Sequence, residues 1–455
     1  MPRFQLPPAA KKADDTILLP ILDATPPKAF GTGDARSLFM LDDEYTNLNH
    51  GELSLSTGSF GSVPKAVHEA SELLSRHFEC NPDRYIREEH PARVDAARAV
   101  VAEHLRVDQD TCVFVPSVAA GMATVLRNFS WTARDVIVCS DVIYDTISSS
   151  VKEICQGDNS PHRSIFKLQL PLSHSSIIEQ FKQHLNSLRT EMEATSVKAG
   201  TPPAKIVVII ESITSSPGIL MPWQEMVRIC RDENVWSVVD AAHSLGQEVD
   251  LDIGVVDPDF WLTDGAKWGY AKRGCGILYV PYRNQDMITS AYLPGLIFGG
   301  PELSTRFVWQ FYWSGLSDPV PPISITFALK FRQQIGGDKM IQKYCHELAM
   351  SGGRRMAQIM NTTMLDSAEN SGEVVANMVN VELPLSHTIR PSGEVYHLFS
   401  QELFETHKVF ATCFVWQDKW WTRVSAQIYN QMDDFERLAR ALLEICRKIA
   451  KDRIV

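Results

Sequence analysis

The chain has 455 residues, of which 44% are hydrophobic and 22% charged, and its formal net charge is −11. A chain of this length is too long for one simple hydrophobic core and indicates two or three domains, and the composition is that of a soluble globular protein. The negative charge argues against a partner such as nucleic acid or an anionic membrane, because binding either would require a basic face.

The nine cysteines are dispersed without CxxC pairs, and most lie in apolar runs. This pattern indicates reduced core residues of a cytoplasmic protein rather than a disulfide framework. No apolar run approaches the roughly 18–20 residues that span a bilayer, and the first residues lack the apolar stretch of a secretory signal. The thirteen histidines are also dispersed, so no metal site is predicted.

Residues 1–40 are rich in proline, alanine and charge, and we expect them to form an extended arm. Residues 63–80 and 91–107 then have helical spacing. Helical stretches alternate further along with apolar, strand-like runs, which are TCVFVPS, DVIVCSDVIYD, SIFKLQLPL, AKIVVIIESIT, VWSVVDAAH, FWLTDGA and CGILYVP. Buried strands that alternate with helices predict an α/β fold with a mainly parallel, seven-stranded sheet covered on both faces.

The character of the sequence changes beyond about residue 325. Long helical stretches there alternate with two strand-like runs, and a final helix is expected at 432–451. We therefore predict a large domain over residues 41–325 and a smaller α+β domain over residues 326–455, which N-terminal residues could complete.

Three features of the large domain suit one cofactor. Asp240 and Lys267 each follow a strand-like run, and ligands in open α/β sheets bind outside the carboxyl ends of strands. The small residues Val118, Ala119 and Ala120 lie at a strand-to-helix turn, where backbone N–H groups could hold a phosphate. Phosphate, aldehyde and ring nitrogen are the groups by which pyridoxal phosphate is held, and the turn, the lysine and the aspartate could hold one each.

Six motifs occur in a characteristic order: LNHG…GSFGSVP, VPSVAAGMATVLRN, SSPG, VVDAAHSLGQ, DGAKWGYAKRGCGILYVP and TRVSAQIYN. From about Tyr45 to the C-terminus the sequence resembles the fold-type I pyridoxal phosphate enzymes, specifically the class V aminotransferase branch with cysteine desulfurases and isopenicillin N epimerase-like proteins. It is particularly similar to the fungal ergothioneine-pathway C–S lyases and the loline-type Mannich cyclase. The resemblance implies pyridoxal 5'-phosphate as cofactor.

The resemblance also implies roles for single residues. Lys267 matches the lysine that forms the internal aldimine, and its apolar flanks would desolvate the amine and favour its nucleophilic form; a solvated loop lysine is the alternative. Asp240 matches the carboxylate that keeps the pyridine nitrogen protonated, with a helix-capping aspartate as the alternative.

Three further residues match positions around the cofactor and the substrate. His243 matches a contact to the phenolic oxygen, and Tyr144 matches an aromatic ring stacked on the pyridoxal, although either could be a packed core residue. Arg423 matches the arginine that binds the substrate carboxylate through its planar guanidinium, with a surface arginine as the alternative.

The sequence departs from the family pattern beside the lysine. The family usually has a histidine where Ala266 stands, and often a small polar residue where Asp264 stands. An aspartate close to a phosphate would repel it, so Asp264 either points away or serves another group. The phosphate turn also lacks the usual threonines, so backbone amides must do more of the binding.

Other departures concern the mouth of the site and the subunit boundary. The family forms homodimers with active sites at that boundary, and the aromatic segment 304–315 fits either a buried interface or packed core. Leu316 replaces a threonine that reaches the neighbouring subunit's cofactor, though Ser314 or Ser317 could substitute. An insertion near residues 52–58 changes the expected shape of the active-site mouth.

The resemblance implies a reaction through an external aldimine and a quinonoid carbanion, with Lys267 as general base or acid. A desulfurase would need a nucleophilic cysteine on a mobile loop, but Cys275 lies at a strand start. A sulfoxide C–S lyase would want a cysteine acid, and Cys155 is the one nearby option.

We therefore predict an amino-acid-processing enzyme of specialised metabolism, such as alkaloid biosynthesis. Its most specific form is a Mannich-type cyclase that uses an aldehyde co-substrate and forms a nitrogen heterocycle at Cα, with or without a preceding β- or γ-elimination. The alternatives are a cysteine-conjugate C–S lyase or desulfurase-like enzyme releasing pyruvate and ammonia, and a non-catalytic binding protein.

Overall fold

The computed structural model describes residues 27, 29–49, 60–170, 172–195, 204–293, 305–313 and 315–452. Most of the predicted N-terminal arm, the insertion near residues 52–58 and Ser314 lie outside these described residues.

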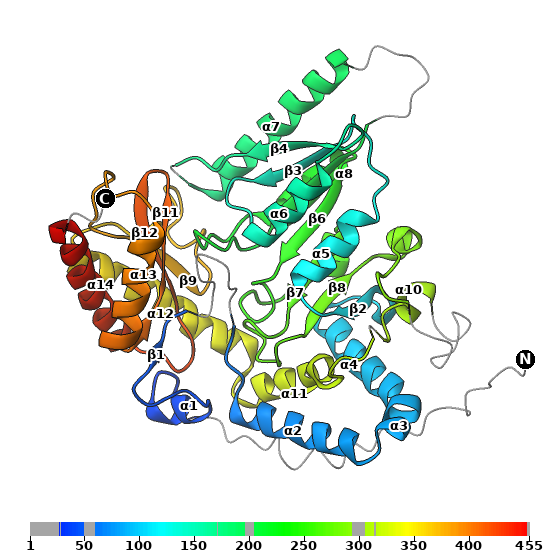
Figure 1. Cartoon of the computed structure of the whole chain (residues 1–455), viewed down its shortest axis with the longest axis horizontal. Helices are drawn as coiled ribbons and strands as arrows, with labels where there is room; N and C mark the ends of the chain where they lie inside the picture. The colour runs from blue at the N-terminus through cyan, green and yellow to red at the C-terminus, as the bar shows by residue number, and fades with distance from the viewer. Residues whose placement is uncertain are drawn as a thin grey trace, which may run out of the picture.

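A seven-stranded sheet forms the centre of the molecule, in the order β2-β8-β7-β6-β5-β3-β4 (Figure 1). Its strands are β2 Cys112–Val115, β3 Val136–Ser140, β4 His162–Phe166, β5 Ile206–Glu211, β6 Trp236–Ala241, β7 Phe260–Asp264 and β8 Gly276–Tyr279. The strands from β4 to β7 pair in parallel, whereas β8 runs antiparallel to both β2 and β7. The predicted α/β fold with a mainly parallel, seven-stranded sheet is therefore confirmed. The chain enters β8 from β7 through a turn instead of a helical crossover, so β8 must reverse direction.

Helices cover both faces of this sheet. One face packs against α5 Val118–Arg127 and α6 Asp145–Ile154. The other face packs against four helices, α4 His90–Leu105, α7 His174–Thr195, α8 Trp223–Asp232 and α11 Val320–Gln334. Within β5, Val207 and Ile209 enter the first core layer while Ile206, Val208 and Ile210 enter the second. This alternation follows from the two-residue period of a strand, and it explains why the run is apolar throughout.

The C-terminal part of the chain forms a second group of elements at one end of the molecule (Figure 1). Its antiparallel sheet has the order β11-β12-β9, with β9 Met378–Glu382, β11 Thr412–Trp416 and β12 Lys419–Ser425. Its main helices are α12 Gly337–Met360, α13 Gly393–Gln401 and α14 Met432–Asp452. Near the N-terminus, β1 Thr46–Asn47 pairs in parallel with β10 Val409–Phe410, so an N-terminal segment lies against this C-terminal part. The boundaries of the two domains remain predictions from the sequence.

The remaining elements are short apart from α2 Lys65–Cys80, which packs on α11. They are α1 Gly33–Ser37, α3 Pro82–Arg84, α9 Ile253–Val256, α10 Arg306–Trp309, the π-helical turns Tyr85–Glu89 and Glu402–Thr406, and the 3-10 turns Gln109–Thr111 and Tyr282–Met287. None of the helices in the described segments combines the length and hydropathy needed to cross a membrane.

Candidate active site

A cavity of about 260 Å³ opens at the carboxyl edge of the parallel strands. Its lining consists of Phe60, Ser117, Val118, Ala119, Tyr144, Ile147, Glu211, Ile213, Ser215, Asp240, Ala242, His243, Asp264 and Lys267. Parallel strands end at the same edge of a sheet, which is why residues so far apart in sequence meet there. All the site residues predicted from the sequence are in this lining except Ala120 and Arg423.

Lys267 lies in the connection between β7 and β8, near the start of α6. Its Nζ is 5.9 Å from the centroid of the Tyr144 ring, which immediately precedes α6. This distance is within the range of a cation–π contact. The lysine therefore lies in the lining of the cavity beside an aromatic ring.

Gly61 holds the backbone around Lys267 in place. Its φ is +59°, and a Cβ atom there would overlap the carbonyl oxygen of Ala266 and lie 3.1 Å from the carbonyl oxygen of Lys267. Arg273 Nε donates to the carbonyl oxygen of Phe60 at 2.7 Å, and its Nη2 donates to that of Gly61 at 3.1 Å. Only glycine permits residues 60–61 to approach the backbone of residues 266–267 so closely, and this contact supports the turn that carries Lys267.

Asp240 belongs to β6 and lies in the wall of the cavity, where it is 5% exposed. Its Oδ1 accepts the backbone N–H of Ala242 at 3.0 Å. Burial raises the pKa of this carboxyl group, the positive charge of Lys267 lowers it, and Asp264 raises it. A buried carboxylate in this position suits a ligand that brings a cationic N–H group.

Glu211 is a second buried carboxylate, and the sequence motifs did not single it out. It ends β5 and pairs in register with Asp240 on β6, and its Oε2 accepts the hydroxyl proton of Ser140 at 2.5 Å. Its position at the end of an apolar run could have indicated from the sequence that Glu211 lies near Asp240, which ends the next strand. Ser215, a few residues later in the same segment, is another lining residue that was missed.

His243 is 2% exposed and belongs to the lining of the cavity. Its Nδ1 accepts the indole N–H of Trp268 at 3.1 Å. Burial lowers the pKa of His243 well below its usual value, and the charges of Lys267 and Arg423 add to this effect. Its Nε2 is buried and has no hydrogen-bond partner within the part of the chain that the structure describes.

The start of α5 forms the wall nearest β2. Ser117 caps this helix by accepting the N–H of Ala120 at 3.2 Å, while Val118 and Ala119 line the cavity. Gly121 lies against Leu262 of β7, and a side chain there would collide with that leucine. Free backbone N–H groups at the start of a helix can bind an anion, although that of Ala120 is already engaged by Ser117.

Asp264 lines the cavity at the end of β7. Its Oδ1 accepts the N–H of Ala266 at 2.8 Å. Burial raises the pKa of this carboxyl group, whereas Lys267 and the N–H groups of its own turn lower it. Its place in the lining favours the second of the two alternatives from the sequence, in which Asp264 serves another group of the ligand.

Arg423 lies on β12, behind the wall of the cavity, and it is fully buried. Its Nη1 donates to the carbonyl oxygen of Ser215, and its Nη2 donates to Asn49 Oδ1 at 3.1 Å. This burial excludes the alternative of a surface arginine. Ser215, which accepts from this guanidinium group, itself lines the cavity.

All nine cysteines of the chain lie in the described segments, and none of them lines the cavity. Cys155 follows the far end of α6, a helix of ten residues or about 15 Å, whose start at Tyr144 borders the cavity. Cys275 is fully buried behind Gly265, and burial raises the pKa of its thiol well above the usual value. Neither cysteine is placed to act as an acid or nucleophile in the cavity.

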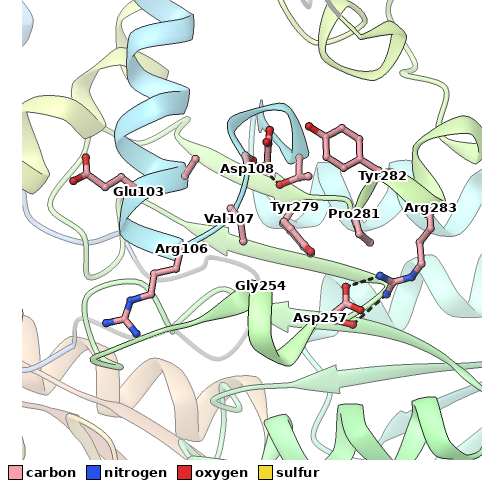
Figure 2. A pocket seen from close by; sticks show the side chains of 12 residues that line it. Glu103, Arg106, Val107, Asp108, Gly254, Asp257, Tyr279, Pro281, Tyr282 and Arg283 are labelled. Carbon is pink, nitrogen blue, oxygen red and sulfur yellow. Dashed lines mark hydrogen bonds and ion pairs between the residues drawn. The ribbon is translucent and has the colours of Figure 1, made fainter.

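A larger hollow of about 540 Å³ lies at the opposite edge of the sheet (Figure 2). Both arginines of its lining already have acidic partners, because Arg283 pairs with Asp257 and Arg106 with Asp250. The described residues that line it include no lysine. The smaller cavity at the carboxyl edge is therefore the candidate active site. In the described segments, no group of three or more histidine, cysteine or carboxylate side chains is arranged to hold a metal ion.

A mainly parallel, seven-stranded sheet with a lysine after β7 and a buried aspartate near the end of β6 defines the architecture of the fold-type I pyridoxal phosphate enzymes. The sequence profile described as "Aminotransferase class-V" matches residues 61–438, and the chain belongs to this family.

Relatives of the chain have names that refer to carbon–sulfur chemistry. An L-cysteine desulfhydrase-like protein of Epichloe uncinata is 28% identical over 449 residues, which cover 90% of this chain and 95% of the relative. The hercynylcysteine sulfoxide lyase of Schizosaccharomyces pombe is 28% identical over 415 residues, covering 90% and 96%. A solved structure of a C-DES mutant with glycine covalently linked to its pyridoxal phosphate cofactor has a TM-score of 0.68 at 17% identity, covering 90% of this chain and 99% of that one. At this identity the likeness shows the fold alone.

Proposed function

We propose that this protein is a pyridoxal phosphate-dependent lyase that acts on an amino-acid substrate. One observation carries the proposal: Lys267, Asp240, His243 and the start of α5 line a single cavity at the carboxyl edge of the sheet. The family to which the chain belongs and the names of its relatives support the same conclusion.

The residues present fit the cofactor group by group. The Lys267 amine suits the aldehyde, the Asp240 carboxylate suits a protonated ring nitrogen, and the first N–H groups of α5 suit the phosphate. The Tyr144 ring suits a flat heterocycle. The buried Nε2 of His243 supplies a hydrogen-bond group that has no protein partner in the described residues, as expected of an atom reserved for a ligand.

Pyridoxal phosphate, when bound, supplies an electron sink for negative charge at the substrate Cα. In the proposed reaction Asp240 keeps the ring nitrogen protonated. Lys267 takes the proton from Cα and can return it to the leaving group or the product. Arg423 and Ser215 orient the substrate carboxylate, and this requires the guanidinium group to exchange part of its bonding with Ser215 for the ligand.

The most direct version of this reaction is C–S bond cleavage in a cysteine conjugate. The Cα proton and the sulfur group leave, the sulfur departs as a protonated thiol or sulfenic acid, and water completes the release of pyruvate and ammonia. A persulfide-forming desulfurase is less well supported, because none of the nine cysteines lines the cavity. The same absence is compatible with a second version, the Mannich-type cyclase, in which an aldehyde co-substrate provides an iminium carbon that bonds to Cα.

Borohydride fixation followed by peptide mass spectrometry tests the cofactor assignment. The cofactor should be found on Lys267, and Lys267→Ala should abolish fixation and activity. Lys272→Ala is the matched control, since Lys272 follows in the same connection and faces Glu72. Fixation at another lysine, or none in the native protein, would contradict the proposal.

A product assay separates the two versions. Cysteine conjugates should give stoichiometric pyruvate and ammonia if the protein is a C–S lyase. Incubation of candidate diamino acids with an aldehyde should give a cyclic amine without pyruvate if it is a cyclase. Exchange of the Cα proton with heavy water is expected in both cases.

We also propose that the active protein is a homodimer with its site at the subunit boundary. Phe60 at the cavity is half exposed, and Leu316 is 97% exposed, although both are large apolar side chains. A partner subunit that covers them would remove this apolar surface from water. Sedimentation analysis of the native protein, compared with Leu316→Asp, measures the oligomeric state.

A further inference from the structure

The hydrogen bond between Trp268 and His243 determines which ring nitrogen of the histidine carries a proton. An indole N–H can only donate, so His243 Nδ1 must act as the acceptor and must carry no hydrogen. A neutral imidazole has one N–H group, which is then at Nε2. A doubly protonated ring would lose the bond to Trp268 and would place a cation next to Lys267.

Trp268 is itself rigidly placed. Its side chain is 1% exposed and packs with Ile213, Ala376 and Met378. Its carbonyl oxygen accepts Nη1 of the buried Arg332 at 2.8 Å. The position of the indole N–H beside His243 is therefore fixed by this packing and by the backbone contact to Arg332.

The opposite edge of the imidazole is left for a ligand. His243 lines the cavity with its Nδ1 edge turned to Trp268, and Nε2 is buried without a partner in the described residues. Leaving a buried N–H group without an acceptor costs free energy. This cost would be offset by an acceptor oxygen that arrives with the ligand.

We propose that Trp268 is a positioning residue that fixes His243 as the neutral Nε2–H tautomer, so that the cavity offers a hydrogen-bond donor to an oxygen atom of the molecule bound at Lys267. This inference rests on the proposed function for the identity of that molecule, in which the acceptor is the phenolic oxygen of the cofactor. The assignment of the tautomer itself does not depend on the proposed function. His243 then neither titrates nor acts as a base near neutral pH.

Charged groups surround this histidine on several elements. Lys267 follows β7 and Arg423 lies on β12, and both positive charges oppose protonation of the ring. The carboxylates of Glu211, Asp240 and Asp264 line the same cavity and would favour protonation. With the indole N–H removed, the outcome depends on this balance, and Nδ1 is free to take a proton.

The test on the holoenzyme compares the visible absorption of the bound cofactor across pH for the native protein and Trp268→Phe. We expect Trp268→Phe to show a one-proton transition between about pH 5 and 8 that the native protein lacks. The double variant Trp268→Phe with His243→Asn should restore the native profile, because an amide donates without titrating. An unchanged profile in Trp268→Phe, or a transition that persists in the double variant, would overturn the role of Trp268.

A second measurement needs neither the cofactor nor a folded variant at position 268. Nitrogen NMR of the native protein labelled at histidine, with the His243 signals assigned by their loss in His243→Asn, reports the two ring nitrogens separately. We expect an unprotonated Nδ1 and a protonated Nε2. A protonated Nδ1 overturns the inference, whereas failure of cofactor binding with the expected tautomer would contradict the proposed function alone.

Discussion

Replacing Gly61 by alanine tests whether the backbone at residues 60–61 positions Lys267. The new Cβ would overlap the carbonyl oxygen of Ala266 and lie 3.0 Å from its carbonyl carbon. Ordinary carbon contacts are roughly 3.5–4.0 Å, so one of the two segments must move by the order of 1 Å. The left-handed backbone adds strain of about 1–2 kcal/mol.

The displacement should matter more for chemistry than the strain does for stability. A misplacement of about 1 Å in a catalytic group can cost on the order of 100-fold in rate. We therefore expect Gly61→Ala to slow covalent attachment of the cofactor and turnover by about two orders of magnitude. Stopped-flow absorbance of apoprotein mixed with pyridoxal phosphate measures attachment, and thermal unfolding measures stability.

Gly337→Ala is the matched control, because Gly337 has a φ of +81° but no atom within 4 Å of the position that a Cβ would take. It should lose a similar amount of stability to backbone strain and keep native attachment kinetics. If both variants attached the cofactor at the native rate, the proposed buttressing of Lys267 by residues 60–61 would be refuted.

Two further predictions concern Arg423 and His90. Arg423→Lys should weaken amino-acid binding by about 10–100-fold, because an ammonium group cannot form the paired contacts of the guanidinium group. Spectral titration measures this binding. Binding of the corresponding amine without a carboxylate should be unaffected, and an equal loss for both ligands would contradict the assignment. For His90, burial lowers the pKa to about 4, although its hydrogen bond to the Tyr312 carbonyl acts to raise it. The unfolded chain takes up this proton near pH 6.5, so the stability from the neutral ring is complete above that pH and is lost as the pH falls toward 4, with the loss reaching about 2 kcal/mol at pH 5. His90→Gln keeps a donor but cannot titrate, so its melting temperature should fall less between pH 7.5 and 5 than that of the native protein; equal slopes would count against this explanation.

The sequence alone located the strands and the residues at their ends. Apolar runs of strand length, alternating with helical spacing, predicted the seven-stranded sheet. Once the sheet is mainly parallel, Asp240 and Lys267 must lie at one edge with the small residues that open α5. This is a consequence of topology, and it required no knowledge of side-chain packing.

The features of the site that the sequence did not predict depend on packing between segments far apart in the chain. Arg423 was recognised by its motif, but its burial behind Ser215 depends on β12, a strand that was not predicted from its sequence. Glu211 enters the cavity because β5 pairs in register beside β6. Cys155 is a candidate from its place in the chain, but the length of α6 places it too far from the cavity to act there.

The sequence thus determined which chemical groups reach the carboxyl edge of the sheet, because strand ends follow from local pattern and chain order. Only the tertiary structure decided how these groups are held: that residues 60–61 press on the lysine turn, and that an indole behind His243 selects its protonated nitrogen. Those contacts join segments whose approach depends on the packing of whole elements, and no local pattern encodes such distances.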